Sequence, residues 1–530
     1  MKLILSIKNF LATSLLFIIA VIFRAIPEAV TFLPLGQDTT MYLAYGKLTV
    51  RLWNYGHFCL YPVLYNMLGL LYLLNVDLGL VMKILPPIFY GLIVSIFFHY
   101  CRSCINLNYV TSVLSALLLL FSPTFLRISW ELHNQQLGLF LFFLSMISFV
   151  KYKTTGKNSW KLAQLVSSIM LALSHQFVAV LYISCLLYLL IYFKVVYAYF
   201  DKLVFINLIT AGLTLIVGYY ARPQIFVPPV TSIIKEDLSK LRNLTWLVNL
   251  TWVAFNLLIP LGVAGWFIHA DNINKHFINP ILFFSSGGII LWVLTGYFLA
   301  LPPERYVWIL IFPLCILTGA FVDKLFMIKN DSLSVTININ RKIAMKKQLN
   351  IKISSRVVAR FIKCFVLLII VCSSLLQSLS LMGLASKPHF LPSNFPYSFP
   401  NTILYNGIFV SEHECFSIII ENINKISSKS DVLIVHYPIY GLAYYYSKVQ
   451  VIRFSYREPV ANVIFFKNGS MTYLRVSNLN QAIFDLKRHG FENFFLIDRY
   501  DQLLRMISKG FNFTRISKCG ELSLIKIVFE

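Results

Sequence analysis

FLATSLLFIIAVIF, the sequence of residues 10–23, contains no charged side chain and lies between Lys8 and Arg24. A helix needs roughly 20 mostly apolar residues to cross a hydrocarbon core of about 30 Å. No small-x-small cleavage site follows the run, which continues into Ile26, Pro27 and Glu28. We therefore interpret it as a retained membrane-spanning helix and not as a cleaved signal peptide.

Similar apolar runs occupy most of the chain. Of its 530 residues, 58% are hydrophobic and 13% are charged, whereas soluble domains average roughly 25% charged residues. The shorter apolar stretch 62–75 predicts an interfacial helix within an outer loop, 27–76. The candidate spans lie at roughly 9–26, 79–100, 108–123, 135–150, 161–175, 177–193, 203–221, 250–268, 280–301, 306–326 and 361–384. We expect a mainly α membrane protein with about eleven transmembrane helices in residues 1–386.

Basic residues indicate the orientation. They gather in alternate loops, including the long basic loop 327–360, and the loops between these are less basic. Such loops are typically cytoplasmic, which also explains the net charge of +24 without a nucleic-acid partner. We expect a multi-pass protein of the cell membrane with a cytoplasmic N-terminus and an extracytoplasmic C-terminal domain. Outside 327–360 the residues are Lys2, Lys8, Arg102, Lys151, Lys153, Lys157, Lys161, Lys194, Lys202 and Lys275.

Residues 387–530 differ in composition and predict a small soluble α/β domain. Four prolines in 388–400 resist helix formation. Strands are then expected at 431–436, 450–453, 493–498 and 523–529, and helices at 439–446, 479–489 and 500–508. Neither a Gly-x-Gly-x-x-Gly turn nor a phosphate loop is present, so we assign no nucleotide to this domain. Cys415 and Cys519 are a candidate disulfide.

The first outer loop carries the main candidate for chemistry. Pro34 and Gly36 predict a turn just beyond the first span, and Asp38 is expected as the N-cap of a helix from Thr39. Capping alone would explain this aspartate. The alternative is a carboxylate fixed at the membrane rim, ready to accept a proton or to hold a metal ion.

Other polar residues recur at the outer ends of later spans. Glu131 and His133 lie in the loop 127–139, His175 ends the fifth predicted span, and Arg305 precedes the tenth. Each has a simpler interpretation, such as hydrogen bonding within the loop, an interfacial histidine, or an arginine that reaches lipid headgroups. Further outer-face candidates are Glu28, Tyr42, Lys83, Arg242 and Glu304.

The order of these motifs resembles the GT-C superfamily of membrane glycosyltransferases, including members similar to protein mannosyltransferases. The resemblance rests on Gly36-x-Asp38-x-x-x-Tyr42, Tyr61-Pro62, the 127–139 segment, Ser174-His175 and Pro303-Glu304-Arg305. It implies a polyprenyl- or dolichyl-phosphate-linked sugar as donor, and a protein, lipid or glycan as acceptor.

For individual residues, the resemblance implies Asp38 as general base. Glu131 and His133 would support it or bind a divalent metal, Mg or Mn. Arg305 would hold the lipid phosphate, helped by His175, Lys83 or Arg242. Glu28, Tyr42 and Glu304 would line the same outer face.

The chain departs from the family pattern in two places. The Trp-Trp-Asp-Tyr-Gly signature of oligosaccharyltransferases is absent, because Trp53-Asn54-Tyr55-Gly56 lies in another loop and lacks the acid. Transfer of a whole oligosaccharide to asparagine is therefore not expected. Glu131 also replaces the more common aspartate, which leaves metal dependence open.

Three other functions fit a chain with many spans. A polysaccharide polymerase or ligase predicts catalytic basic residues in a large late outer loop, but the long loop here is expected to be cytoplasmic. A transporter predicts ionisable residues or broken helices in mid-span, whereas the charges here lie at the rims. An inactive GT-C-like scaffold would keep the layout without the chemistry.

Overall fold

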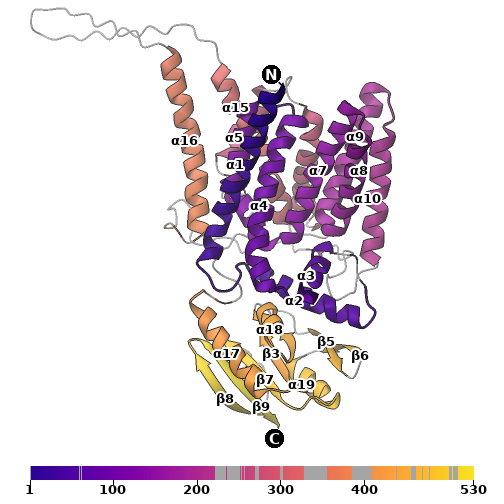
Figure 1. Ribbon diagram of the computed structural model, residues 1–530, viewed down its shortest axis with the longest axis vertical. Helices are drawn as coiled ribbons and strands as arrows, with labels where there is room; N and C mark the ends of the chain where they lie inside the picture. Colours follow the sequence, from indigo (N-terminus) through magenta and orange to yellow (C-terminus); the bar gives the residue numbers. More distant parts are fainter. Residues whose placement is uncertain are drawn as a thin grey trace, which may run out of the picture.

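The computed structural model describes residues 2–220, 254–268, 274–298, 303–327, 355–384, 408–454, 461–499 and 511–529, apart from single residues or pairs within them, plus 234–235, 251 and 504. The helical part and the C-terminal domain lie at opposite ends of the long axis. The N-terminus is at the far end of the helical part from the C-terminal domain (Figure 1).

Each predicted span overlaps a helix. These are α1 (Lys2–Ala29), α4 (Leu78–Ser103), α5 (Tyr109–Leu120), α7 (His133–Thr155), α8 (Asn158–Ser174), α9 (Gln176–Tyr197), α10 (Lys202–Tyr220), α12 (Leu258–Ile268), α13 (Asn279–Thr295), α15 (Ile311–Met327) and α16 (Ser355–Leu381). In the described part of the chain, five helices are long and apolar enough to cross a membrane. The number becomes six if α5 and the following α6 (Pro123–Glu131), bent by 57°, form one span. A multi-pass membrane protein is thus supported, and the number eleven stays a prediction.

One span ends earlier than its apolar run suggests. The run 280–301 predicts a span, but α13 ends at Thr295. Beyond it, β2 (Tyr297–Phe298) pairs antiparallel with β1 (Ile234–Lys235). The end of the run therefore forms backbone hydrogen bonds with a distant segment and does not extend the helix.

Two short helices, α2 (Gln37–Asn54) and α3 (Val63–Leu73), lie between the helical bundle and the C-terminal domain (Figure 1). The helix expected at 62–75 is confirmed. The expectation that Asp38 is an N-cap is wrong, because Gly36 is the N-cap of α2 and Asp38 lies in its first turn. Backbone conformation and packing explain why α2 begins after Gly36. This residue has a φ of 91°, and a Cβ there would lie 2.0 Å from the Trp130 carbonyl oxygen. Only glycine meets both conditions.

The C-terminal domain contains a five-stranded sheet in the order β4-β3-β7-β9-β8. Strand β3 (Val432–His436) is parallel to β4 (Gln450–Phe454) and β7 (Phe494–Arg499), and β9 (Leu522–Phe529) is antiparallel to β7 and β8 (Phe511–Cys519). The first four residues of β3 are all buried, as in a strand that is covered on both faces of the sheet. One face packs against α17 (His413–Ile426) and α18 (Tyr440–Tyr446), and the other against α19 (Leu479–Arg488).

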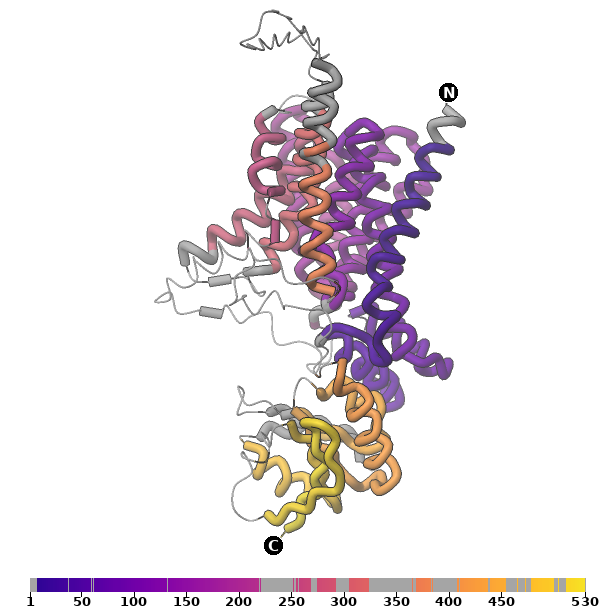
Figure 2. The backbone as a smooth tube through the Cα atoms, turned by 90° about the vertical axis from the view of Figure 1, so that its left-hand side faces the viewer, coloured from indigo at the N-terminus to yellow at the C-terminus, as the bar shows by residue number. Residues whose placement is uncertain are grey.

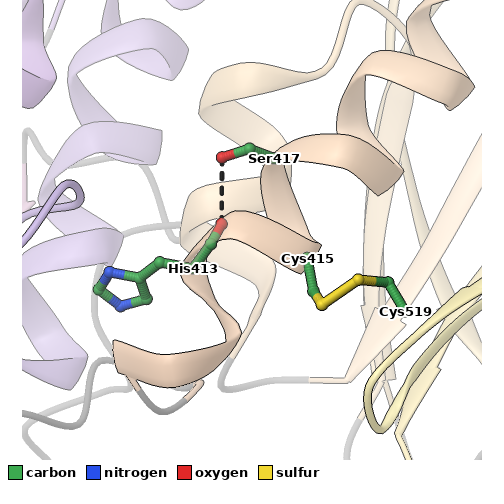
Figure 3. Close-up of a disulfide and its surroundings, with 4 residues drawn as sticks. All are labelled: His413, Cys415, Ser417 and Cys519. Atoms are coloured by element: carbon green, nitrogen blue, oxygen red, sulfur yellow. Dashed lines mark hydrogen bonds between the residues drawn. A yellow bond between two sulfur atoms is a disulfide. The ribbon is translucent and has the colours of Figure 1, made fainter.

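The expected α/β elements are confirmed except for the helix at 500–508, which lies almost wholly outside the described residues. Helix α17, strand β8 and the hairpin of β5 (Ala461–Lys467) and β6 (Ser470–Val476) were not predicted. The disulfide between Cys415 and Cys519 is confirmed, and it joins α17 to the end of β8 (Figure 3). In the same helix, the Ser417 hydroxyl donates to the His413 carbonyl.

The interfacial helices and the C-terminal domain share one apolar core. The buried side chains of α2 and α3 and those on the α17–α18 face of the sheet belong to a single continuous cluster. The views in Figures 1 and 2 both place the domain directly beyond α2 and α3. The domain is therefore packed on the end of the bundle where the predicted site residues lie.

Candidate active site

The break between α6 and α7 is the centre of the candidate site. Helix α6 ends at Glu131 and α7 begins at His133. The first turn of α7 consists of four polar residues, and all four side chains are buried: His133, Asn134, Gln135 and Gln136. Burial of polar groups without partners is costly, so the contacts of these four residues decide what the site can do.

The first turn of α2, which contains Asp38, contacts one side of this turn of α7. The Thr39 hydroxyl lies 2.8 Å from the Trp130 carbonyl oxygen and 2.8 Å from His133 Nε2. The Tyr42 hydroxyl accepts a hydrogen bond of 3.2 Å from the Asn134 backbone N–H. Asp38, half-buried, directly precedes Thr39. The structure thus brings the first turn of α2 to the start of α7.

Arg305 and His175 lie on the other side. Arg305 Nη1 is 3.4 Å from Gln135 Oε1 and 3.4 Å from His175 Nε2. Arg305 belongs to α14 (Pro303–Ile309), and His175 separates α8 from α9. Two residues predicted to bind the lipid phosphate are therefore adjacent, although they come from segments 130 residues apart.

A buried arginine that the sequence analysis did not single out positions α14. The guanidinium carbon of Arg127 lies 5.4 Å from the ring centroid of Trp130 and 5.1 Å from that of Trp308. Cation–π contacts of this kind stabilise a fixed arrangement of the two rings. Arg127 thereby joins α6 to the helix that carries Arg305.

Several polar atoms in this region are buried and unpartnered among the described residues. They include Asn134 Oδ1, Gln135 Nε2, Gln136 Nε2 and His175 Nδ1. Each such atom costs about 1–3 kcal/mol unless something pairs with it. Their concentration around the start of α7, beside a guanidinium, indicates a place for a polar or anionic ligand.

Two of the outer-face candidates hold the loop after α1. Glu28 forms a buried ion pair of 3.0 Å with Arg24 and accepts a hydrogen bond of 3.2 Å from the Leu35 N–H. Lys83 donates to the Thr31 carbonyl at 2.5 Å. These contacts fix the segment that leads into α2, so both residues have a structural role in this structure. Arg242 and the side chains of Glu131 and Glu304 lie outside the described residues.

The C-terminal domain reaches the same loop. Arg453, near the end of β4, hydrogen-bonds the Tyr45 hydroxyl, and the charge of Asp38 also acts on that hydroxyl. Burial raises the pKa of Tyr45 and the guanidinium of Arg453 opposes this effect. Arg453 was not predicted, although the carboxyl end of a parallel strand is where ligand sites of α/β sheets usually lie.

Contacts between α18 and α2 join the C-terminal domain to the interfacial helices. A Cβ on Gly441 would lie 2.3 Å from the carbonyl oxygen of Thr40, so the two helices touch backbone to backbone. Lys47 donates to three carbonyls at the end of α18, those of Tyr444 (3.0 Å), Tyr445 (3.0 Å) and Ser447 (2.9 Å). Burial, with a smaller contribution from Arg51, lowers the pKa of Lys47 to about 8.

The described residues do not form a metal site. No three His, Cys, Asp or Glu side chains among them gather closely enough to hold an ion. His133, the proposed ligand, has Nε2 at 2.8 Å from Thr39 and Nδ1 at 3.2 Å from Gln136. Its ring therefore fits hydrogen-bonding support better than metal ligation, and we derive no step through a metal ion.

Comparisons with known proteins leave the family open. No family model matches the sequence, and no curated protein is significantly similar to it. Among solved structures, the chain is similar to the apo form of an oligosaccharyltransferase from Archaeoglobus fulgidus. The identity is 10%, the match covers 92% of this chain and 70% of that chain, and the TM-score is 0.47. At this level the likeness carries no argument about function.

Proposed function

We propose that the protein is an integral-membrane glycosyltransferase that moves a sugar from a polyprenyl-phosphate carrier to an acceptor at the extracytoplasmic face. One observation carries the proposal: the first turn of α2, which contains Asp38, and the Arg305–His175 pair both contact the first turn of α7. Several buried polar atoms there have no hydrogen-bond partner among the described residues. We propose that the Asp38 carboxylate and the Arg305 guanidinium act on one substrate here, because glycosyl transfer from a phosphate needs a base and a cation.

In the proposed reaction, the acceptor hydroxyl attacks the anomeric carbon of the sugar. Asp38 takes the hydroxyl proton as the new C–O bond forms. The bond between the anomeric carbon and the phosphate oxygen breaks, and the polyprenyl phosphate leaves with the bonding electron pair. Arg305 stabilises this negative charge with the fork of its guanidinium, and His175 and Gln135 orient it.

Two features support the extracytoplasmic location. The Cys415–Cys519 disulfide lies in the C-terminal domain, and disulfides persist in oxidising compartments. The domain is at the end of the bundle opposite the N-terminus, which the basic loops assign to the cytoplasm (Figure 1). A reporter fused after Glu530 is expected to be active outside the cytoplasm.

The proposal is tested with purified protein and radiolabelled polyprenyl-phosphate sugars. Asp38→Asn keeps the shape of the side chain and removes the base, so release and transfer of the sugar should fall roughly 10²–10⁴-fold. Asp323→Asn is the control, because Asp323 hydrogen-bonds Asn108 at the other end of the bundle, at 2.6 Å. Equal transfer by wild type and Asp38→Asn would remove Asp38 from the mechanism. No transfer by wild type from any carrier would favour an inactive scaffold.

A further inference from the structure

A polar cavity lies at the opposite end of the bundle from the candidate active site. Its volume is about 550 Å³, and it opens among the N-terminal part of α1, the end of α4 and the end of α7. The lining residues are Asn9, Phe10, Thr13, His99, Arg102, Ser103, Val150, Lys151 and Thr154. The N-terminus marks this end of the molecule (Figures 1 and 2).

The cavity is positively charged. Arg102 and Lys151 both line it, and none of its lining residues is acidic. Neither of these two cations is in an ion pair within the part of the chain that the structure describes. Lys153, only two residues away, forms an ion pair with Asp201. Two cations in one cavity without a carboxylate favour an anionic occupant.

Polar groups in the cavity add directed contacts. The Thr13 hydroxyl donates to the Asn9 carbonyl at 2.7 Å, so His99 Nε2, 2.9 Å away, donates to Thr13. Arg102 donates to the Leu107 carbonyl through Nη1 at 2.6 Å, which fixes the position of its guanidinium. Asn9 Oδ1 is buried and has no partner among the described residues, so it is available to accept a hydrogen bond from an occupant.

The outer face of α1 beside the cavity is apolar. Phe10, which lines the cavity, is 70% exposed. Leu11, Leu15, Ile18 and Ile22 continue along the helix at spacings of three and four residues, and each is at least half exposed. In a membrane this stripe faces acyl chains. A basic cavity at the rim and an apolar stripe below it match the headgroup and the chains of one lipid.

We propose that this cavity binds the headgroup of an anionic phospholipid at the N-terminal end of the bundle. The phosphate would lie between Arg102 and Lys151, Asn9 would accept from a headgroup hydroxyl, and the chains would follow α1. Basic pockets between transmembrane helices are known to recognise such headgroups. This site is separate from the candidate active site and does not depend on the proposed function.

The test measures lipid retained by the full-length protein in native mass spectrometry. Phosphatidylglycerol and phosphatidylcholine with identical chains are supplied in equal amounts. We expect wild type to retain phosphatidylglycerol in about tenfold excess, and the double variant Arg102→Gln, Lys151→Gln to lose most of this preference. Lys157→Gln, an exposed change at the same end but outside the cavity, should keep the preference.

Two further arms keep the test decisive. Lys151→Arg preserves the charge and should keep the preference, and equal melting temperatures in phosphatidylcholine show that the variants fold. A preference that is absent in wild type, or that survives in the double variant, overturns the proposal. Displacement of phosphatidylglycerol by millimolar inorganic phosphate would identify a site for free phosphate and would also overturn it.

Discussion

Helix α7 passes through two buried polar clusters that differ in how completely they are paired. At its middle, Ser145 lies 2.7 Å from the Tyr182 hydroxyl, which is 2.6 Å from Ser168, and Ser168 donates to Asn207 at 2.9 Å. At its start, Asn134 and Gln135 keep atoms that have no partner in the described part of the chain. The hydroxyl cluster joins α7, α8, α9 and α10 to one another.

The difference indicates two uses for buried polar groups in a membrane protein. Hydrogen bonds across helices stabilise packing where hydroxyls pair with one another, as those of Ser145, Tyr182 and Ser168 do. Beside them, the Ser148 hydroxyl and the Gln164 amide have no partner among the described residues, so the pairing is complete only within the hydroxyl cluster itself. Groups that remain unpaired destabilise the free protein, and at the start of α7 a bound ligand would supply the missing partners. If the start of α7 is a ligand site, changes there should reduce activity. If the middle of α7 is a packing contact, changes there should reduce stability.

Among the variants that test this contrast, Gly36→Ala should have the largest effect on activity. The added Cβ would meet the Trp130 carbonyl oxygen, so the start of α2, which carries Asp38, must move away from α6. Displacement of a catalytic group by about 1 Å costs roughly 10²-fold in rate, and we expect at least that loss in sugar transfer. Gly56→Ala is the matched control, because Gly56 also has a positive φ, 77°, but its Cβ would meet nothing within 4 Å. If both variants lost activity equally, backbone strain and not the close approach would be responsible.

Gln135→Leu should reduce transfer about 10- to 100-fold, since a hydrogen bond to the charged Arg305 is worth roughly 1.5–3 kcal/mol. Its melting temperature should not fall, because the change also removes a buried unpaired Nε2. Activity is measured per folded protein, and stability by thermal denaturation in detergent. If the variant were less stable but fully active, Gln135 would contribute to helix packing and not to sugar transfer.

Tyr182→Phe should show the opposite behaviour. Loss of the hydroxyl removes the shared partner of Ser145 and Ser168, which should cost about 1 kcal/mol of stability. Transfer by the folded fraction should equal that of wild type. Reduced transfer by correctly folded protein would show that the middle of α7 contributes to function, and the contrast between the two clusters would fail.

The sequence predicted those parts of this arrangement that depend on local pattern. Apolar runs located the helices of the bundle, and short motifs singled out Asp38, His133, His175 and Arg305. The contact of Arg453 with Tyr45 joins residues about 400 positions apart, and no local pattern encodes it. The wrong cap assignment has a similar cause, because the start of α2 is set by the Trp130 carbonyl, which belongs to the distant helix α6.

Helix α17 escaped prediction for a different reason. Its sequence HECFSIIIENINKI mixes β-branched and polar residues, which individually favour strands and turns. Burial of Phe416, Ile419, Ile420 and Ile423 against the sheet overrides these preferences. These four residues also follow the i, i+3, i+4, i+7 spacing of an amphipathic helix, so a signal was present in the sequence and the prediction overlooked it.

An effect of similar size, seen only at low pH, concerns the junction of the C-terminal domain and the bundle, where a buried histidine is neither in the ligand site nor in the hydroxyl cluster. Burial, together with the charge of Lys83, lowers the pKa of His413 to about 4, from 6.5. The unfolded state then binds a proton that the folded state does not between those two pH values, so stability should fall as the pH drops from about 6.5 towards 4. At pH 5.5 the loss should be about 1.4 kcal/mol relative to pH 8. His413→Gln should reduce this dependence, as measured by thermal denaturation at both pH values, while His57→Gln, an exposed histidine on the adjoining loop, should leave it unchanged. An identical pH dependence in wild type and His413→Gln would show that other groups control stability at the junction.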